Sequence, residues 1–182
     1  MLKSKYQKLV PQLQKELGLK SISAVPKVQK VIVHVSAGKA VLEPKLIEVV
    51  REELKKITGQ KPVVTKAKKS IAGFKLRENV EIGVMVALRG PRMYDFLDKL
   101  VNITLPRVRD FQGLPDKGFD NHGGFNLGIR EHIAFPEVVF ENVEKILSLQ
   151  VTIVTTGKSK VQTKALLKAL GFPFQTEDNK KI

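Results

Sequence analysis

The chain has 182 residues and a formal net charge of +14, from 32 Lys and Arg against 18 Asp and Glu. It contains no cysteine, which excludes disulfide scaffolds, cysteine-ligated metal centres and thiol nucleophiles. Because 42% of the residues are hydrophobic but no apolar run reaches the roughly 18 to 20 residues of a membrane span, we expect a globular, intracellular protein with a polyanionic partner.

Helical and strand patterns alternate along the chain. Apolar residues at spacings of three and four predict helices that end at Gly18, Gly59 and Gly171, and Pro44 is expected in the first turn of the second one. Alternating apolar residues predict strands, most clearly over residues 80–88. The expected elements are a helix over 2–17, a strand over 27–36, a helix over 43–58, a strand over 62–65, an extended loop over 66–79, a strand over 80–88, a helix over 90–105, an aperiodic loop over 107–128, a strand over 149–155 and a helix over 159–170.

This order predicts an α+β fold, with an antiparallel or mixed β-sheet, α-helices packed on one face and two long functional loops. The other face of the sheet would carry small or cationic residues, namely Lys30, His34, Gly83, Ala87 and Arg89. An open basic sheet is a common platform for RNA. An ordinary solvent-facing sheet has the same pattern, so both interpretations stay open.

The positive charge is concentrated in the first half of the chain. Residues 1–92 hold 20 Lys and Arg against 7 Asp and Glu, a net charge of +13, whereas residues 93–182 hold 12 against 11, a net charge of +1. Such a bias causes self-repulsion in a compact state. We therefore expect the first half to bind a polyanion, with solvated helix faces as the alternative for some of the lysines.

The segment 59–77 is the strongest local indication of nucleic-acid binding. It contains six Lys and Arg and no acidic residue, mixed with Ser, Thr and Gln that can donate to phosphate or sugar oxygens. No apolar face of helical period accompanies these cations, which argues against a helix lying on a membrane. Phe74 is either a core anchor or an exposed ring on which a base stacks.

Signals of enzymatic activity are weak. The histidines, His34, His122 and His132, lack the spacing of metal ligands. Residues 156–159, Thr-Gly-Lys-Ser, resemble the end of a phosphate-binding loop, but Thr152 stands where the first glycine of that motif is required. We expect no catalytic residue, metal or cofactor, and a nucleotide- or RNA-acting enzyme that uses the turn Thr156–Ser159 remains the alternative.

Short motifs follow one another in order over nearly the whole chain, at residues 25–28, 59–74, 88–93, 105–114, 128–131, 135–137 and 172–174. Together they resemble the fifth large-subunit ribosomal protein family of bacterial type, the proteins that bind 5S rRNA in the central protuberance. The resemblance implies a single rRNA-binding domain over residues 1–182, with a basic first half and a near-neutral second half. It further implies a structural constituent of the large subunit on the cytoplasmic ribosome, which helps to attach 5S rRNA.

The same resemblance implies partners and contact residues. The partners would be 5S rRNA, large-subunit rRNA, peptidyl-site tRNA and a small-subunit head protein, with no membrane and no small-molecule substrate. The residues implied to bind 5S rRNA are His34, Gln60, Lys61, Thr65, Lys66, Lys68, Lys69, Ser70 and Arg89. Those implied to contact tRNA are Gly73, Phe74, Lys75, Leu76 and Arg77. Those implied to form an inter-subunit bridge are Arg109, Asp110, Phe111, Gln112 and Gly113.

Overall fold

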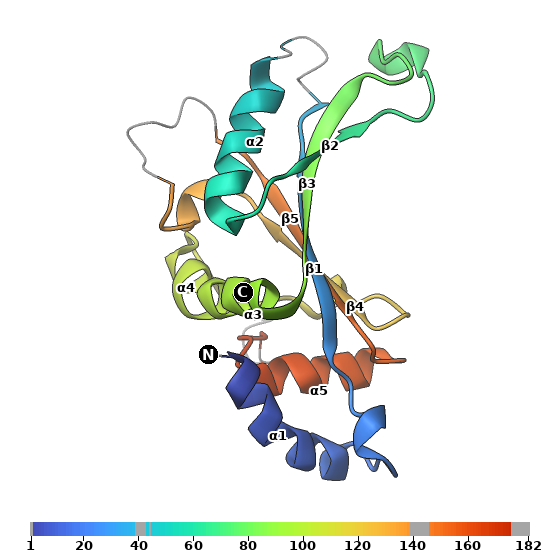
Figure 1. Cartoon of the computed structure of the whole chain (residues 1–182), viewed down its shortest axis with the longest axis vertical. Coiled ribbons are helices and arrows are strands. Elements are labelled where there is room, and N and C mark those ends of the chain that lie inside the picture. The colour runs from blue at the N-terminus through green and yellow to red at the C-terminus, as the bar shows by residue number, and fades with distance from the viewer. Residues whose placement is uncertain (1, 39–42, 44, 139–145, 176–182) are drawn as a thin grey trace. The chain divides into compact units, whose positions relative to one another are not determined.

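The computed structural model describes residues 2–38, 43, 45–138 and 146–175 (Figure 1). The helices are α1 Leu2–Glu16, α2 Lys45–Thr58, α3 Gly90–Lys99, α4 Leu105–Arg107 and α5 Lys160–Leu170. The strands are β1 Val28–Ser36, β2 Val63–Lys66, β3 Glu81–Leu88, β4 Gly124–Ile129 and β5 Leu149–Thr155. The strands form one sheet in the order β2-β3-β1-β5-β4. The expected α+β class is confirmed.

The chain divides into two compact units. Unit 1 consists of residues 1–31, 89–127 and 152–182, and unit 2 of residues 32–88 and 128–151. The expected organisation as a single rRNA-binding domain stays a prediction.

In unit 2, helix α2 packs against strand β3 (Figure 1). Alternation in β1 and β3 sends one set of side chains into this core. The apolar residues buried there include Val33, Val35, Val84, Val86, Leu88, Val50 and Leu54. Helix α2 ends at Thr58 and is followed by Gly59, whose φ of +66° is readily adopted by glycine. The expected first-turn Pro44 lies outside the described residues.

In unit 1, helix α1 packs against α3 and α5. Leu2 and Leu13 of α1 are buried, and the Lys5 ammonium donates to the Leu170 carbonyl oxygen at the end of α5 (3.1 Å). Helix α5 begins at Ser159, whose hydroxyl accepts from the Gln162 amide (3.4 Å), and ends at Gly171. The expected helix limits at these two residues are therefore confirmed.

The expectation of an aperiodic loop over residues 107–128 was wrong in its last part, where β4 begins. Phe125, Leu127 and Ile129 alternate toward the core. The intervening residues are Gly124, Asn126 and Gly128, which are depleted in strands. Because these residues are rare in strands, the alternation of Phe125, Leu127 and Ile129 was not read as a strand. Pairing with the neighbouring strand of the sheet stabilises β4.

Candidate nucleic-acid interface

Strands β1, β2 and β3 bring His34, Thr65 and Gly83 close together on the face of the sheet opposite the core of unit 2, and we call these three residues the notch. Thr65 in β2 pairs with Gly83 in β3, and His34 in β1 alternates with the buried Val33 and Val35. A Cβ atom at Gly83 would lie 2.8 Å from Thr65 Oγ1 and 3.0 Å from His34 Nε2. The glycine thus allows a hydroxyl and an imidazole, both expected to bind rRNA, to converge on one point.

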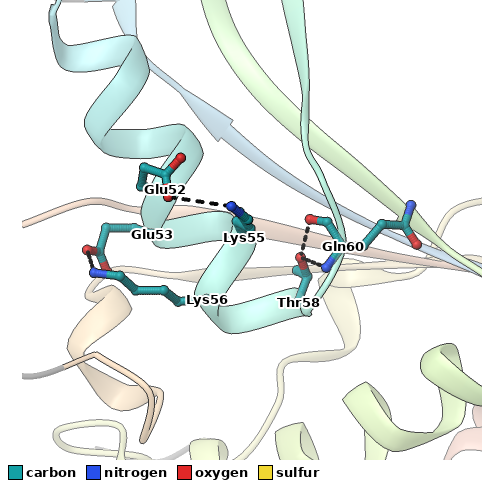
Figure 2. A network of polar contacts seen from close by, with 6 residues as sticks. All are labelled: Glu52, Glu53, Lys55, Lys56, Thr58 and Gln60. Atoms are coloured by element: carbon teal, nitrogen blue, oxygen red, sulfur yellow. Dashed lines mark hydrogen bonds and ion pairs between the residues drawn. The ribbon is translucent and has the colours of Figure 1, made fainter.

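Gln60 is fixed at the end of α2 by a short polar network (Figure 2). The Thr58 hydroxyl donates to the Leu54 carbonyl oxygen (2.7 Å) and accepts from the Gln60 amide (3.4 Å). The Gln60 side-chain Nε2 then donates to the Ala87 carbonyl oxygen in β3 (3.2 Å). Gln60 therefore ties α2 to β3, in addition to any contact with a ligand.

The segment between β2 and β3, residues 67–80, is a folded hairpin that we call the finger (Figure 1). At its base, the Ala67 amide donates to the Val80 carbonyl oxygen (2.8 Å), and the Asn79 amide donates to the Ala67 carbonyl oxygen (3.0 Å). Near its tip, Ile71 and Leu76 exchange two backbone hydrogen bonds of 2.9 and 3.1 Å. The segment between the two strands is a loop, as expected, but it is not extended, because backbone pairing closes it at both ends.

The tip of the finger is built around a short 3₁₀ turn over Ala72–Phe74, followed by Lys75 with φ of +51°. Phe74 is 76% exposed, so it is not a core anchor. A large apolar ring held outward on a closed hairpin has the geometry of a stacking platform.

Exposed lysines lie within the finger, at the end of β2 that leads into it, and in the segment between α2 and β2. Lys61, Lys66, Lys68 and Lys69 are exposed, and no carboxylate of the described residues lies within 4 Å of their ammonium groups. Ser70 contributes to the local structure, because its hydroxyl accepts from the Glu78 amide (2.9 Å). Unneutralised ammonium groups beside an exposed ring match a partner that has both phosphates and bases.

Comparison with known proteins decides the family. Residues 21–77 match the family model for ribosomal protein L5, and residues 81–174 match the model for the C-terminus of the ribosomal L5 family. The chain is 52% identical over 174 residues to the large ribosomal subunit protein uL5 of Streptococcus pneumoniae (strain Hungary19A-6), covering 95% of this chain and 97% of that protein. It is 51% identical over the same length to uL5 of Streptococcus pyogenes serotype M49 (strain NZ131), with the same shares covered. The chain belongs to the ribosomal protein L5 family.

Membership confirms the expected resemblance and the expectation of a structural protein rather than an enzyme. It also places the action of this L5-family chain at the ribosome, as expected. In the described part of the chain no helix is long and apolar enough to cross a membrane. Within the same residues no group of three His, Cys, Asp or Glu side chains has the arrangement of a metal site.

The turn Thr156–Ser159 of this L5-family chain uses its polar groups internally. The Gly157 amide donates to Thr155 Oγ1 (3.0 Å), and the Lys158 amide donates to Gln162 Oε1 (2.9 Å). In a phosphate-binding loop such amides must point at the ligand. The resemblance to that motif therefore reflects the entry into α5. The alternative of a nucleotide- or RNA-acting enzyme was wrong, because the family is one of structural ribosomal proteins.

The same turn packs on the start of β4. The hydroxyls of Thr155 and Thr163 both donate to the Gly123 carbonyl oxygen, at 2.7 and 3.0 Å. Gly123 has φ of +82°, and a Cβ atom there would overlap the Gly157 carbonyl group. These groups form a buried joint within unit 1 that leaves no space for a ligand.

Two groups of expected site residues belong to unit 1, whereas the finger belongs to unit 2. Arg89 is exposed and immediately precedes α3. The expected bridge segment 109–113 follows α4, and the side chains of Arg109 and Asp110 are 83% and 91% exposed. The end of this segment is anchored, because the Leu114 amide donates to the Pro173 carbonyl oxygen (2.8 Å). Arg109 and Asp110 are thus exposed in a segment whose C-terminal end is held by a backbone hydrogen bond.

The sequence analysis did not predict one pair of polar side chains in the sheet, Thr152 and Asn126. The Thr152 hydroxyl in β5 donates to Asn126 Oδ1 in β4 (2.7 Å), and both side chains are half-buried. They alternate with buried apolar residues, so they lie on the side of their strands that faces away from the core of unit 1. Because β4 was not expected from the sequence, Asn126 was not considered. For Thr152, the regular alternation of apolar residues in β5 already indicated that this side chain lies on the opposite side of the strand from the buried ones.

Proposed function

We propose that this L5-family protein is a structural constituent of the large ribosomal subunit that binds 5S rRNA and helps to hold it in the central protuberance. The observation that carries the proposal is the finger with its flanking notch, since unpaired lysines, hydroxyls and an imidazole lie together within unit 2. The names of the relatives, large ribosomal subunit protein uL5, support the large subunit as the site of assembly.

Phosphate contacts would supply most of the affinity. Lys61, Lys66, Lys68 and Lys69 form no ion pair within 4 Å among the described residues, although Glu81 lies opposite Lys66 across β2 and β3. Each ammonium can therefore neutralise a phosphate and release a counterion. Thr65 and His34, converging on Gly83, would contribute hydrogen bonds to sugar or base edges. On this account the lysines determine the affinity for RNA, and the notch contributes to the selection of one RNA over another.

The tip of the finger would contact tRNA in the peptidyl site. Its exposed Phe74 can stack on an unpaired base, and Lys75 and Arg77 can neutralise adjacent phosphates. Because backbone hydrogen bonds within the hairpin close it, little ordering would be needed on binding.

The segment 109–113 would contact a protein of the small-subunit head and form an inter-subunit bridge. This segment belongs to the near-neutral half of the chain. Its exposed Arg109 and Asp110 offer one charge of each sign, with the carboxylate within 4.0 Å of the guanidinium. Such a mixed surface is better suited to a protein than to RNA.

The test is the affinity for 5S rRNA across a salt series, with Lys66, Lys68 and Lys69 changed together to Ala. We expect weaker binding and a salt slope reduced by about two to three, roughly 0.9 per lost phosphate contact. The matched control changes Lys45, Lys55 and Lys56 of α2 to Ala, which removes the same charge from unit 2. If the first variant keeps both the affinity and the slope of the wild type, the finger is not the rRNA site.

A further inference from the structure

Helix α1 carries a second unpaired basic surface. Four of its residues are lysines and one is a glutamate. Because of the helical period, Leu2 and Leu13 lie on the buried side, and the opposite half of the helix carries three of these lysines. We call this half the α1 face; its exposed residues are Lys3, Ser4, Gln7, Lys8, Pro11, Gln12 and Lys15.

The lysines of the α1 face differ from those of α2. On α2, Lys55 and Lys56 lie 3.9 and 2.8 Å from Glu52 and Glu53 (Figure 2), the ordinary arrangement of a solvated helix. On the α1 face, no carboxylate of the described residues lies within 4 Å of any lysine ammonium. Lys5, outside this face, has a structural role because it donates to the Leu170 carbonyl oxygen.

The position of Lys3, in the first turn of α1, is also unfavourable for the stability of the helix. The first turn of a helix favours acidic side chains, because the helix dipole is positive there. The first turn of α1 has no acidic residue and carries Lys3. Lys3 opposes the helix dipole, and no carboxylate on the α1 face offsets its charge. An external anion bound to this face would compensate for both the dipole and the missing counter-charge.

The spacing and the packing identify the kind of anion. Lys3 and Lys15 are twelve residues apart, which corresponds to about 18 Å of helix. A single phosphate cannot reach both, so the ligand must be an extended polyanion. A membrane surface is disfavoured, because the apolar side of α1 is already packed against α3 and α5.

We propose that the α1 face is a second RNA-binding surface, in which Lys3, Lys8 and Lys15 contact the phosphate backbone of ribosomal RNA. Naming ribosomal RNA rests on the proposed function, but the surface itself belongs to unit 1 and uses none of the residues of the finger. Gln7 and Gln12 lie between the lysines and supply further donors for phosphate or ribose oxygens.

The experiment compares three variants of the full chain by fluorescence anisotropy on a 20-base-pair RNA duplex and on 5S rRNA. The α1 variant carries Lys3→Ala, Lys8→Ala and Lys15→Ala. The finger variant carries Lys66→Ala, Lys68→Ala and Lys69→Ala, and the control carries Lys45→Ala, Lys55→Ala and Lys56→Ala. We expect the α1 variant to bind the duplex several-fold more weakly than the control does, with a salt slope smaller by about two to three.

The two proposals fail separately. An effect of the α1 variant without an effect of the finger variant would sustain the α1 face and overturn the finger as the rRNA site. An α1 variant that matches the control on both RNAs would overturn the α1 face. Equal RNA binding with weaker binding of poly-glutamate would reassign the face to an acidic protein and also overturn the proposal. The variant Lys8→Gln with Lys15→Gln, which keeps long polar side chains, decides the outcome if the triple variant lowers the unfolding temperature.

Discussion

Gly83 and Gly123 lie where neighbouring backbone or side-chain atoms leave little room for a side chain. At Gly83 the neighbours are Thr65 Oγ1, His34 Nε2 and the Val35 carbonyl oxygen, and the last lies 3.0 Å from where a Cβ would be. At Gly123 the neighbour is the backbone of Gly157. The first glycine therefore shapes the proposed RNA surface, and the second serves only the core of unit 1.

Replacement of Gly83 by Ala should destabilise the protein. The new methyl group would lie 2.8 Å from Thr65 Oγ1 and 3.0 Å from both His34 Nε2 and the Val35 carbonyl oxygen. These neighbours must shift to make room, which costs about 1–3 kcal/mol in the free energy of unfolding. Urea denaturation measures this change. The matched control is Gly128→Ala in β4, where no atom lies within 4 Å of the added Cβ, and it should be neutral or slightly stabilising. Equal unfolding free energies for the two variants would show that the notch is not tightly packed.

His132 is the buried histidine of the described residues. Its Nδ1 accepts from the Leu147 amide (3.2 Å), while its own amide donates to the Leu147 carbonyl oxygen (3.0 Å). Burial lowers the pKa of His132, because it disfavours the charged imidazolium, and the carboxylate of Glu53 opposes this shift in part. The folded state therefore favours the neutral imidazole more strongly than the unfolded state does.

This lowered pKa makes stability depend on pH. As pH falls below about 6.5, the unfolded state takes up a proton at His132 before the folded state does. The free energy of unfolding should accordingly decrease from pH 7.5 to pH 5. In the variant His132→Asn, an amide oxygen can replace Nδ1 as the acceptor without titrating. Urea denaturation across this range should show a shallower decrease for the variant, and parallel pH profiles would contradict the assignment.

At the scale of elements, local signals predicted some boundaries and long-range pairing determined others. The strand Leu149–Thr155 was expected with the limits that the structure shows, because its alternation is regular. The finger was not recognisable as a hairpin, since the bonds between Ile71 and Leu76 close a turn without an alternating pattern. The notch depends on the register of Thr65 with Gly83, which no local pattern specifies.

The finger offers a test that separates binding from folding. Because Phe74 is 76% exposed, Phe74→Ala should change the free energy of unfolding by less than about 0.5 kcal/mol. Loss of one stacked base should weaken tRNA binding by about 1–3 kcal/mol, measured by filter binding. Val161→Ala in α5, at a side chain that is 71% exposed, is the control and should leave binding unchanged. Unaltered tRNA affinity for Phe74→Ala would exclude the ring as a stacking platform.

For the whole molecule, the structure shows that the positive charge of the first half of the chain is divided between the two units. The basic first half does not correspond to one unit, because residues 1–31 belong to unit 1 and residues 32–88 to unit 2. Residues 1–31 hold 7 Lys against 1 Glu, a net charge of +6, and residues 32–88 hold 11 Lys and Arg against 6 Glu, a net charge of +5. Each unit thus carries its own basic segment, one containing α1 and the other containing the finger.

The most direct test of the central claim is footprinting of 5S rRNA with and without the protein, in competition with an unrelated RNA of equal length. A protein that recognises 5S rRNA through the finger and the notch should protect one region of it and bind it in preference to the competitor. The Lys66, Lys68 and Lys69 triple variant should lose that protection. Equal affinity for both RNAs, with no defined footprint on 5S rRNA, would contradict the account.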